Sequence, residues 1–218
     1  MILLLIAVTV ILLAAARVRV LPPITFRRIT LLYAAAAAGF SGLALEMTVI
    51  YFYQVRLGYA YRTVGMLIAL FMLGLAVGAR LSSAWLDDSR NGGKGLFRLL
   101  MADQLLTGAV AVGYPFFLRL FPGQRMLWSF AIPASMILVG LLVGVSFPLA
   151  VEGLLGTGAK GGRTAGSVNA LDHLGAALGA FLTAALFLPV LGIVGNGLIT
   201  GALAFSSALL LAAGFGSK

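Results

Sequence analysis

Four ionisable side chains lie inside strongly apolar stretches of this sequence and are the first candidates for chemistry. They are Glu46, Asp103, Asp172 and His173, and Asn169 precedes the last pair by one helical turn. Ionisable groups are costly inside lipid, so they mark candidate sites for ions, protons or substrates. One interpretation is a polar track that binds a cationic substrate or relays protons. In such a track, Asp103, Asn169, Asp172 and His173 would lie at the cytoplasmic opening. Glu46 would lie roughly 10 Å deeper, at 1.5 Å per helical residue.

The alternative interpretation is structural. Each polar group would then be buried against a neighbouring helix and paired with an arginine, an amide or the backbone. Asp172 follows the Lys160–Arg163 loop closely enough to act as an interfacial residue near a helix start, where the helix dipole favours negative charge. Asp172 and His173 point about 100° apart on a helix, so we do not expect one acid–base pair.

Aromatic residues crowd a second segment, around the end of the second apolar stretch. Tyr51, Tyr53, Tyr59 and Tyr61 lie within eleven residues, together with Arg56. An aromatic belt at a membrane interface explains such a cluster. A docking patch for an external partner is the sharper hypothesis.

Several kinds of chemistry are excluded by residue type. There is no cysteine, which excludes disulfides, thiolate metal sites and iron–sulfur clusters. The single histidine excludes a haem held by two histidines of one copy and a multi-histidine metal site, and we expect no cofactor. The glycine-rich segments Asn91–Gly95 and Gly156–Gly162 do not match the phosphate-loop pattern, and neither follows a strand.

The elements that must position these residues are membrane helices. Hydrophobic residues make up 61% of the chain and charged residues 10%, against about 25% charge in a soluble domain. Runs of about 20 apolar residues predict helices that cross a bilayer. The seven predicted spans are Met1–Ala16, Ile29–Tyr53, Thr63–Ala84, Leu96–Leu118, Leu127–Ala150, Ala165–Pro189 and Gly192–Gly214. We therefore predict an all-α, polytopic membrane bundle forming a single domain over residues 1–218, with a six-helix core at 29–214.

Basic residues predict how the bundle is oriented. Eleven of the lysines and arginines fall on the side of the odd-numbered connections and of Lys218, and four fall on the other side. The positive-inside rule then places the N-terminus outside and the C-terminus in the cytoplasm. The localisation that we expect is a bacterial inner membrane. Since these cations sit at helix ends, the net charge of +9 indicates contact with anionic lipid rather than with nucleic acid.

The first predicted span has two interpretations. Met1–Ala16 could be a secretory signal with Ala14–Ala16 as its cleavage site. Its amino end carries no positive charge, however, and four arginines follow it. Cleavage would leave those arginines outside, so an uncleaved helix is favoured.

Glycines recur at four-residue spacing inside four of the predicted helices. This spacing puts both glycines on one helix face and lets two backbones approach closely. We expect these faces to pack the bundle internally, with dimerisation as the alternative. The pairs are Gly74/Gly78, Gly140/Gly144, Gly175/Gly179 and Gly197/Gly201.

Several segments together resemble a known family. Gly39–Glu46, Leu67–Gly78, Ser146–Leu149, Asn169–Ala180 and Leu188–Gly192 resemble the integral-membrane part of membrane-bound spermidine synthase-like proteins. The resemblance covers roughly Ala35 to Leu211, although the family often has tyrosine or another residue where His173 stands. It implies a membrane module that usually precedes a soluble aminopropyltransferase domain. The sequence ends at Lys218, after the seventh predicted span, so we expect no aminopropyl transfer from it.

Three functions remain open from the sequence. The first is a non-catalytic membrane subunit that anchors or assists a separately encoded partner, either a polyamine-type synthase or a respiratory or cytochrome-containing assembly. The second is a small transporter or channel, acting alone or as a homodimer, that moves a cation such as a polyamine, with Glu46 and Asp172 as its negative sites. The third is an intramembrane enzyme that uses His173 with Asp172.

Overall fold

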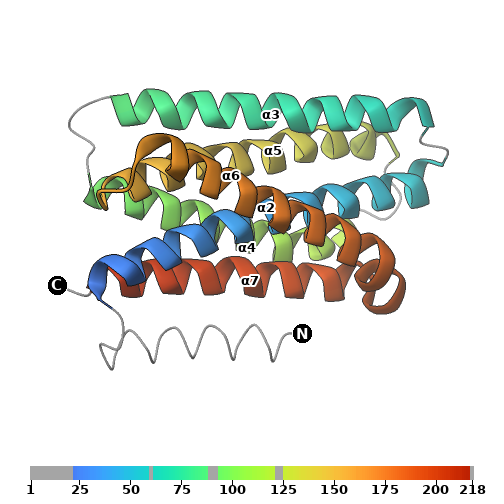
Figure 1. The fold of residues 1–218 in the computed structure, drawn as a ribbon. Coiled ribbons are helices and arrows are strands. Elements are labelled where there is room, and N and C mark those ends of the chain that lie inside the picture. The colour runs from blue at the N-terminus through green and yellow to red at the C-terminus, as the bar shows by residue number, and fades with distance from the viewer. Residues whose placement is uncertain (1–21, 59–60, 88–92, 121–124, 217–218) are drawn as a thin grey trace.

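Every regular element in the described part of the chain is a helix. A computed structural model describes residues 22–58, 61–87, 93–120 and 125–216 (Figure 1). Its elements are α2 (Pro23–Leu57), α3 (Tyr61–Asp87), α4 (Lys94–Leu120), α5 (Arg125–Leu155), α6 (Gly161–Leu182), the π-helix η1 (Thr183–Leu191) and α7 (Gly192–Gly216). The predicted all-helical class is therefore confirmed over these residues.

Five helical stretches are long and apolar enough to cross a membrane, fewer than the seven predicted. The fifth, Gly161–Gly214, joins α6, η1 and α7 without a break and so contains the sixth and seventh predicted spans. At 1.5 Å per residue its 54 residues measure about 81 Å, far longer than one crossing needs. The first predicted span, Met1–Ala16, lies outside the described residues.

The long fifth stretch reverses direction between α6 and α7. Figure 1 shows α6 and α7 running in opposite directions, joined at the end of the bundle by η1. The turn itself falls at Gly192, whose φ of 69° is a left-handed conformation that favours glycine. The chain thus turns at the boundary between the sixth predicted span, which ends at Pro189, and the seventh, which begins at Gly192.

Helix α2 forms the centre of the bundle. It contacts every other described helix, most extensively α6, and nearly all its residues from Ala34 to Ile50 are buried. By contrast, α3 lies at the edge in Figure 1, packs mainly on α5, and leaves large apolar side chains exposed. Such an exposed apolar face suits a helix that faces lipid.

Glycines bring paired helices into backbone contact. At each predicted position, an added Cβ would overlap atoms of another helix. The pairs contact α5 (Gly74/Gly78), α3 (Gly140/Gly144), α2 (Gly175/Gly179) and α4 (Gly197/Gly201). The prediction of internal packing is confirmed for all four pairs.

The two ends of the bundle differ in charge. One end holds the start of α2 and the start of α6, on the left in Figure 1, and we call it the basic end. Its described basic side chains are Arg27, Arg28, Arg80, Arg98, Lys160 and Arg163. The opposite end has Arg56 and Arg119.

Two glycine substitutions in α3 test the backbone packing. Gly74→Ala should destabilise the bundle by about 1–3 kcal/mol, because the new methyl group would meet the Ile137 carbonyl of α5. Gly65→Ala, where nothing lies within 4 Å, should leave stability unchanged or raise it by up to about 1 kcal/mol through helix propensity. Thermal unfolding in detergent measures both. Equal effects of the two substitutions would contradict close α3–α5 packing.

Candidate functional site

The five polar residues predicted as one site occupy three separate places in the bundle. Asp103 lies between α4 and α5, close to α2. Asn169, Asp172 and His173 lie on α6, with Asp172 against α2. Glu46 is buried in α2. Each place has a different environment and therefore different chemical possibilities.

Asp103 belongs to a buried hydrogen-bond network. The Ser146 hydroxyl of α5 donates to Asp103 Oδ2. The neighbouring Gln104 Nε2 donates to Ser146 Oγ and to the Ala34 carbonyl of α2, each at 3.4 Å. The network ties three helices together in the way the structural interpretation of Asp103 predicts. Inside lipid, such interhelical hydrogen bonds also satisfy groups that would otherwise be unpaired.

On α6, Asp172 faces inward and His173 faces outward. The Asp172 carbonyl packs against Gly39, while the His173 side chain is 72% exposed. Asn169 is exposed on the same side as His173. The imidazole Nδ1–H donates to the Asn169 carbonyl at 2.9 Å, since a carbonyl oxygen can only accept. In the neutral ring this leaves Nε2 as an acceptor at the surface of the bundle.

Asp172 and His173 also approach each other more closely than their positions on a helix predict. His173 Nδ1 lies 3.6 Å from Asp172 Oδ2. The two residues lie on different sides of α6, as the 100° between neighbouring positions predicts, but the expectation that they would not pair was wrong, because side-chain torsions bring these two atoms to ion-pair distance. The Nδ1 proton is donated to the Asn169 carbonyl, so the contact with Asp172 is an ion-pair distance and not a second hydrogen bond.

Glu46 is the most isolated of the five. Its side chain is 3% exposed, and no hydrogen bond or ion pair joins it to any described residue. Its helix neighbours Leu45, Val49 and Ile50 belong to an apolar cluster that includes side chains of α3, α4 and α5. An ionised carboxylate in such surroundings is very costly without a counterpart. The group thus needs a proton or a cation that the described bundle does not supply.

Glu46 and Asp172 lie on a common side of α2. Gly39, which contacts Asp172, is seven residues before Glu46, so both positions share one helix face about 10 Å apart. No described hydrogen bond links the two carboxylates. They are therefore two candidate positions along one face of α2 rather than a single bonded centre.

A further buried network was missed by the sequence analysis. Asn196 of α7 donates to Thr48 of α2 at 2.7 Å and accepts from Thr183 of η1 at 3.1 Å. It fixes the reversal between α6 and α7 against the central helix. Single uncharged polar residues in apolar runs are common, so the only sequence signal was one asparagine and two threonines without a shared spacing.

The predicted outer patch is only partly described. Tyr51 is exposed, and Tyr53 donates to Thr63 of α3 at 3.2 Å. Arg56 lies over the Phe52 ring, 5.7 Å from its centroid. Tyr59 lies outside the described residues, as does the side chain of Tyr61. The described members lie at the end opposite the basic end, as an interfacial belt requires.

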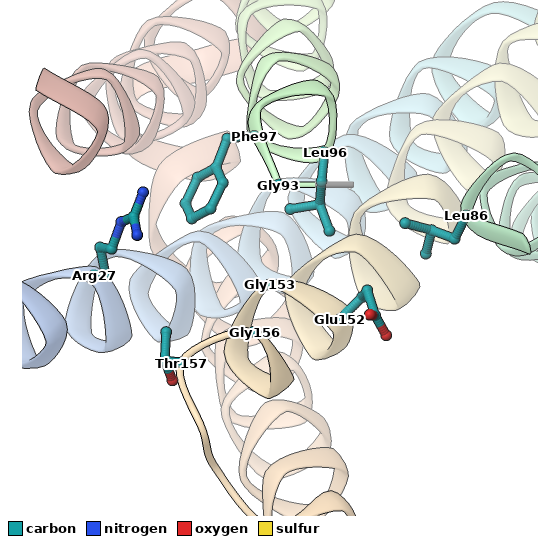
Figure 2. Close-up of a pocket in the computed structure, with 9 residues that line it drawn as sticks. All are labelled: Arg27, Leu86, Gly93, Leu96, Phe97, Glu152, Gly153, Gly156 and Thr157. Atoms are coloured by element: carbon teal, nitrogen blue, oxygen red, sulfur yellow. The ribbon is translucent and has the colours of Figure 1, made fainter. Parts of the chain in front are cut away.

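A pocket of about 170 Å³ opens at the basic end, away from the five candidates (Figure 2). Arg27 lies over the Phe97 ring, with its guanidinium carbon 5.4 Å from the centroid. Figure 2 shows Glu152 across the pocket from Arg27. None of the polar residues predicted as a site lines this pocket.

Known proteins give no further guidance on this chemistry. No protein-family model, curated protein or solved structure matches this chain. The resemblance to the membrane part of spermidine synthase-like proteins therefore stays a prediction. Within the described ranges, no group of three or more histidines, cysteines, aspartates and glutamates could hold a metal ion.

The Asp103 network can be tested by removing its donor. Ser146→Ala should destabilise the bundle by about 1–3 kcal/mol, because it leaves a buried carboxylate oxygen without a hydrogen bond. The control is Ser82→Ala, where the buried hydroxyl bonds to the Ala79 carbonyl of its own helix, with an expected effect within about 0.5 kcal/mol. Thermal unfolding in one detergent compares them. A loss for Ser146→Ala no larger than the control would contradict the network.

Proposed function

We propose that this protein is a non-catalytic membrane subunit that holds a partner chain against the outer face of α6. The observation that carries the proposal is the pair Asn169 and His173, exposed on that face close to the middle of the bundle. The same proposal places the basic end in the cytoplasm, following the positive-inside rule. It also places the chain in a bacterial inner membrane.

The positions of two arginines along α2 give the depth of each residue in the membrane. Arg28 and Arg56 are 28 residues apart, or about 42 Å, close to the thickness of a bilayer with its head groups. The midpoint falls at Gly42. Gly39, at the level of Asp172, is three residues or about 4.5 Å from that midpoint. His173 therefore belongs to the hydrocarbon region and not to the interface.

A polar pair at this depth is poorly matched to lipid. His173 Nε2 and the Asn169 amide have no water to bond with in the hydrocarbon core, and unsatisfied polar groups there are costly. Their neighbours on the exposed face are apolar, including Leu174, Leu178 and Phe181. A transmembrane helix of a partner would cover this face and supply the missing hydrogen bonds.

The chemistry of the face defines the partner. Since Nδ1–H is used within α6, the free Nε2 accepts, and the partner must offer an N–H or O–H donor at the same depth. Small residues such as Ala170 and Ala177 on the exposed side permit a close approach. The exposed face of α3 provides a contrast, because its large side chains Met72, Leu73 and Val77 suit lipid alone.

The proposal predicts where a partner can be cross-linked. A photoreactive residue at Leu178 of α6 should capture another chain in the native membrane, whereas one at Leu73 of α3 should capture little besides lipid. Both leucines are 53% exposed, so accessibility is matched. His173→Leu should lower the Leu178 yield about threefold, the worth of one interhelical hydrogen bond.

Two outcomes would contradict this function. One is equal capture at Leu178 and Leu73. The other is capture at Leu178 of only a second copy of this chain, identified by mass spectrometry. Thermal unfolding of His173→Leu should match the wild type within about 0.5 kcal/mol, because the side chain is exposed. If His173→Leu lowered both the cross-link yield at Leu178 and the thermal stability, the substitution would be acting on folding and not on the partner contact.

A second candidate function rests on Glu46. A buried carboxylate without a bonded partner, about 6 Å from the midpoint of α2, is suited to binding a small cation in transit. Under this proposal, the chain transports a cation such as a polyamine, with Asp172 as the second negative position on the same face of α2. The bundle would have to open around Glu46, because its immediate surroundings are apolar.

Flux into liposomes tests this alternative directly. Radiolabelled putrescine should enter vesicles that contain the protein, and Glu46→Gln should abolish that uptake without unfolding the bundle. Glu152→Gln, which alters an exposed glutamate at the basic end, is the matched control and should leave uptake unchanged. Uptake equal to that of protein-free vesicles would rule out transport of this cation. Unchanged uptake in Glu46→Gln would remove Glu46 from the mechanism.

A further inference from the structure

A second groove at the basic end has features that neither proposed function uses. It has a volume of about 380 Å³ and lies where the start of α2, the end of α5 and the start of α6 meet. Three cationic side chains line it, Arg28, Lys160 and Arg163, and no acidic residue does. The remaining lining residues are Leu32, Leu154, Gly158, Ala159, Thr164 and Ser167.

The three cations have no carboxylate partner among the described residues. Arg28 is held in place by Thr157, through Nε to the hydroxyl at 3.0 Å and Nη2 to the carbonyl at 2.9 Å. Those bonds fix the guanidinium on the wall of the groove and leave Nη1 for another acceptor. Lys160 and Arg163 are exposed and form no described ion pair. Three positive charges in one groove without an acid indicate an anionic ligand.

The backbone adds to this positive field. Helix α6 begins at Gly161, and the Thr164 amide is the first to bond back, to the Lys160 carbonyl at 3.0 Å. The amides before it have no acceptor within the helix. An added Cβ at Gly161 or Gly162 would meet nothing within 4 Å, so the first turn is open to a ligand. A 22-residue helix also places partial positive charge there.

The position of the groove selects the kind of anion. Arg28 lies at one end of the α2 segment that matches the bilayer thickness, so the groove is at the level of lipid head groups. Leu32 and Leu154 extend its wall toward the apolar part of the bundle. We propose that this groove binds a phosphate group, with the anionic head group of a membrane lipid as its source. The arginines bind phosphate oxygens through charge-assisted hydrogen bonds, and the leucines contact the acyl chain.

Native mass spectrometry of the full chain, released from phosphatidylcholine nanodiscs doped with phosphatidylglycerol, tests this site. The double variant Lys160→Gln/Arg163→Gln should weaken phosphatidylglycerol binding by about fivefold for each charge removed. The matched control is Arg80→Gln/Arg98→Gln, which removes two charges at the same end outside the groove. It should change binding less than about twofold. Arg163→Lys, which keeps the charge, should retain most of the affinity.

A second arm separates the two sources of phosphate. Inorganic phosphate is titrated against the protein in pure phosphatidylcholine nanodiscs, with thermal stabilisation as the readout. Stabilisation by phosphate that the double variant loses, without selective phosphatidylglycerol binding, would support the same site with a soluble ligand. Equal losses of lipid in the double variant and its control, or binding of neither ligand, would overturn the proposal. The altered side chains are exposed, so unfolding curves without ligand should coincide.

Discussion

Close contact between helix backbones is the interaction on which the rest of this bundle depends. Lipid offers no hydrophobic drive between helices, so their association relies on van der Waals packing and a few hydrogen bonds. At Gly74, Gly140 and Gly175 the contact is so close that the carbonyls of the next helix occupy the space of a side chain. The central position of α2 follows from the same principle, because its run from Ala34 to Ala38 lets several helices approach at once.

Such close packing determines how polar groups can be arranged. Helices in backbone contact leave little room for a continuous aqueous path, so each polar residue must be satisfied where it lies. Asp103 is satisfied by Ser146, and Asn196 by Thr48 and Thr183. Glu46 and the outward pair on α6 have no such bond to another described helix, and the buried hydroxyls of Ser41, Thr200 and Ser207 are also without a hydrogen-bond partner in the described part of the chain. A polar group that the fold itself leaves unsatisfied is a stronger functional candidate than one already bonded.

The positions of the helices in the sequence were predictable, whereas which helix packs against which was not. Each predicted span from Ile29 onward falls within described helix, because the length of an apolar run directly reports a membrane helix. The number of spans differs for two reasons. The first predicted span lies outside the described residues, and helical hydrogen bonding continues from Gly161 to Gly214 through the reversal at η1, which joins two predicted spans into one stretch. The glycine spacing predicted a packing face, but the facing helix depends on the three-dimensional arrangement.

The candidate site shows the same division. Intramembrane charge identified the residues, but the direction of each side chain around its helix decided its role. Asp172 and His173 are adjacent in sequence, yet one lies against α2 and the other faces outward. Ser146 appeared only as part of an apolar motif, and its bond to Asp103 needed the approach of α4 to α5. Sequence alone carries no register between helices, and that register determines which polar groups meet.

Both proposed contacts of this protein with its surroundings fall on α6, and the packing explains why. At Gly175 and Gly179 no side chain separates the two helices, so the backbone of α6 packs directly against the backbone of α2. Its larger and more polar side chains, Asn169 and His173 among them, are then free of any role in the described core. Its first turn emerges beside Arg28, which Thr157 already holds at the end of α5. A helix secured on one face by glycines can offer its other face to a partner helix and its amino end to a lipid.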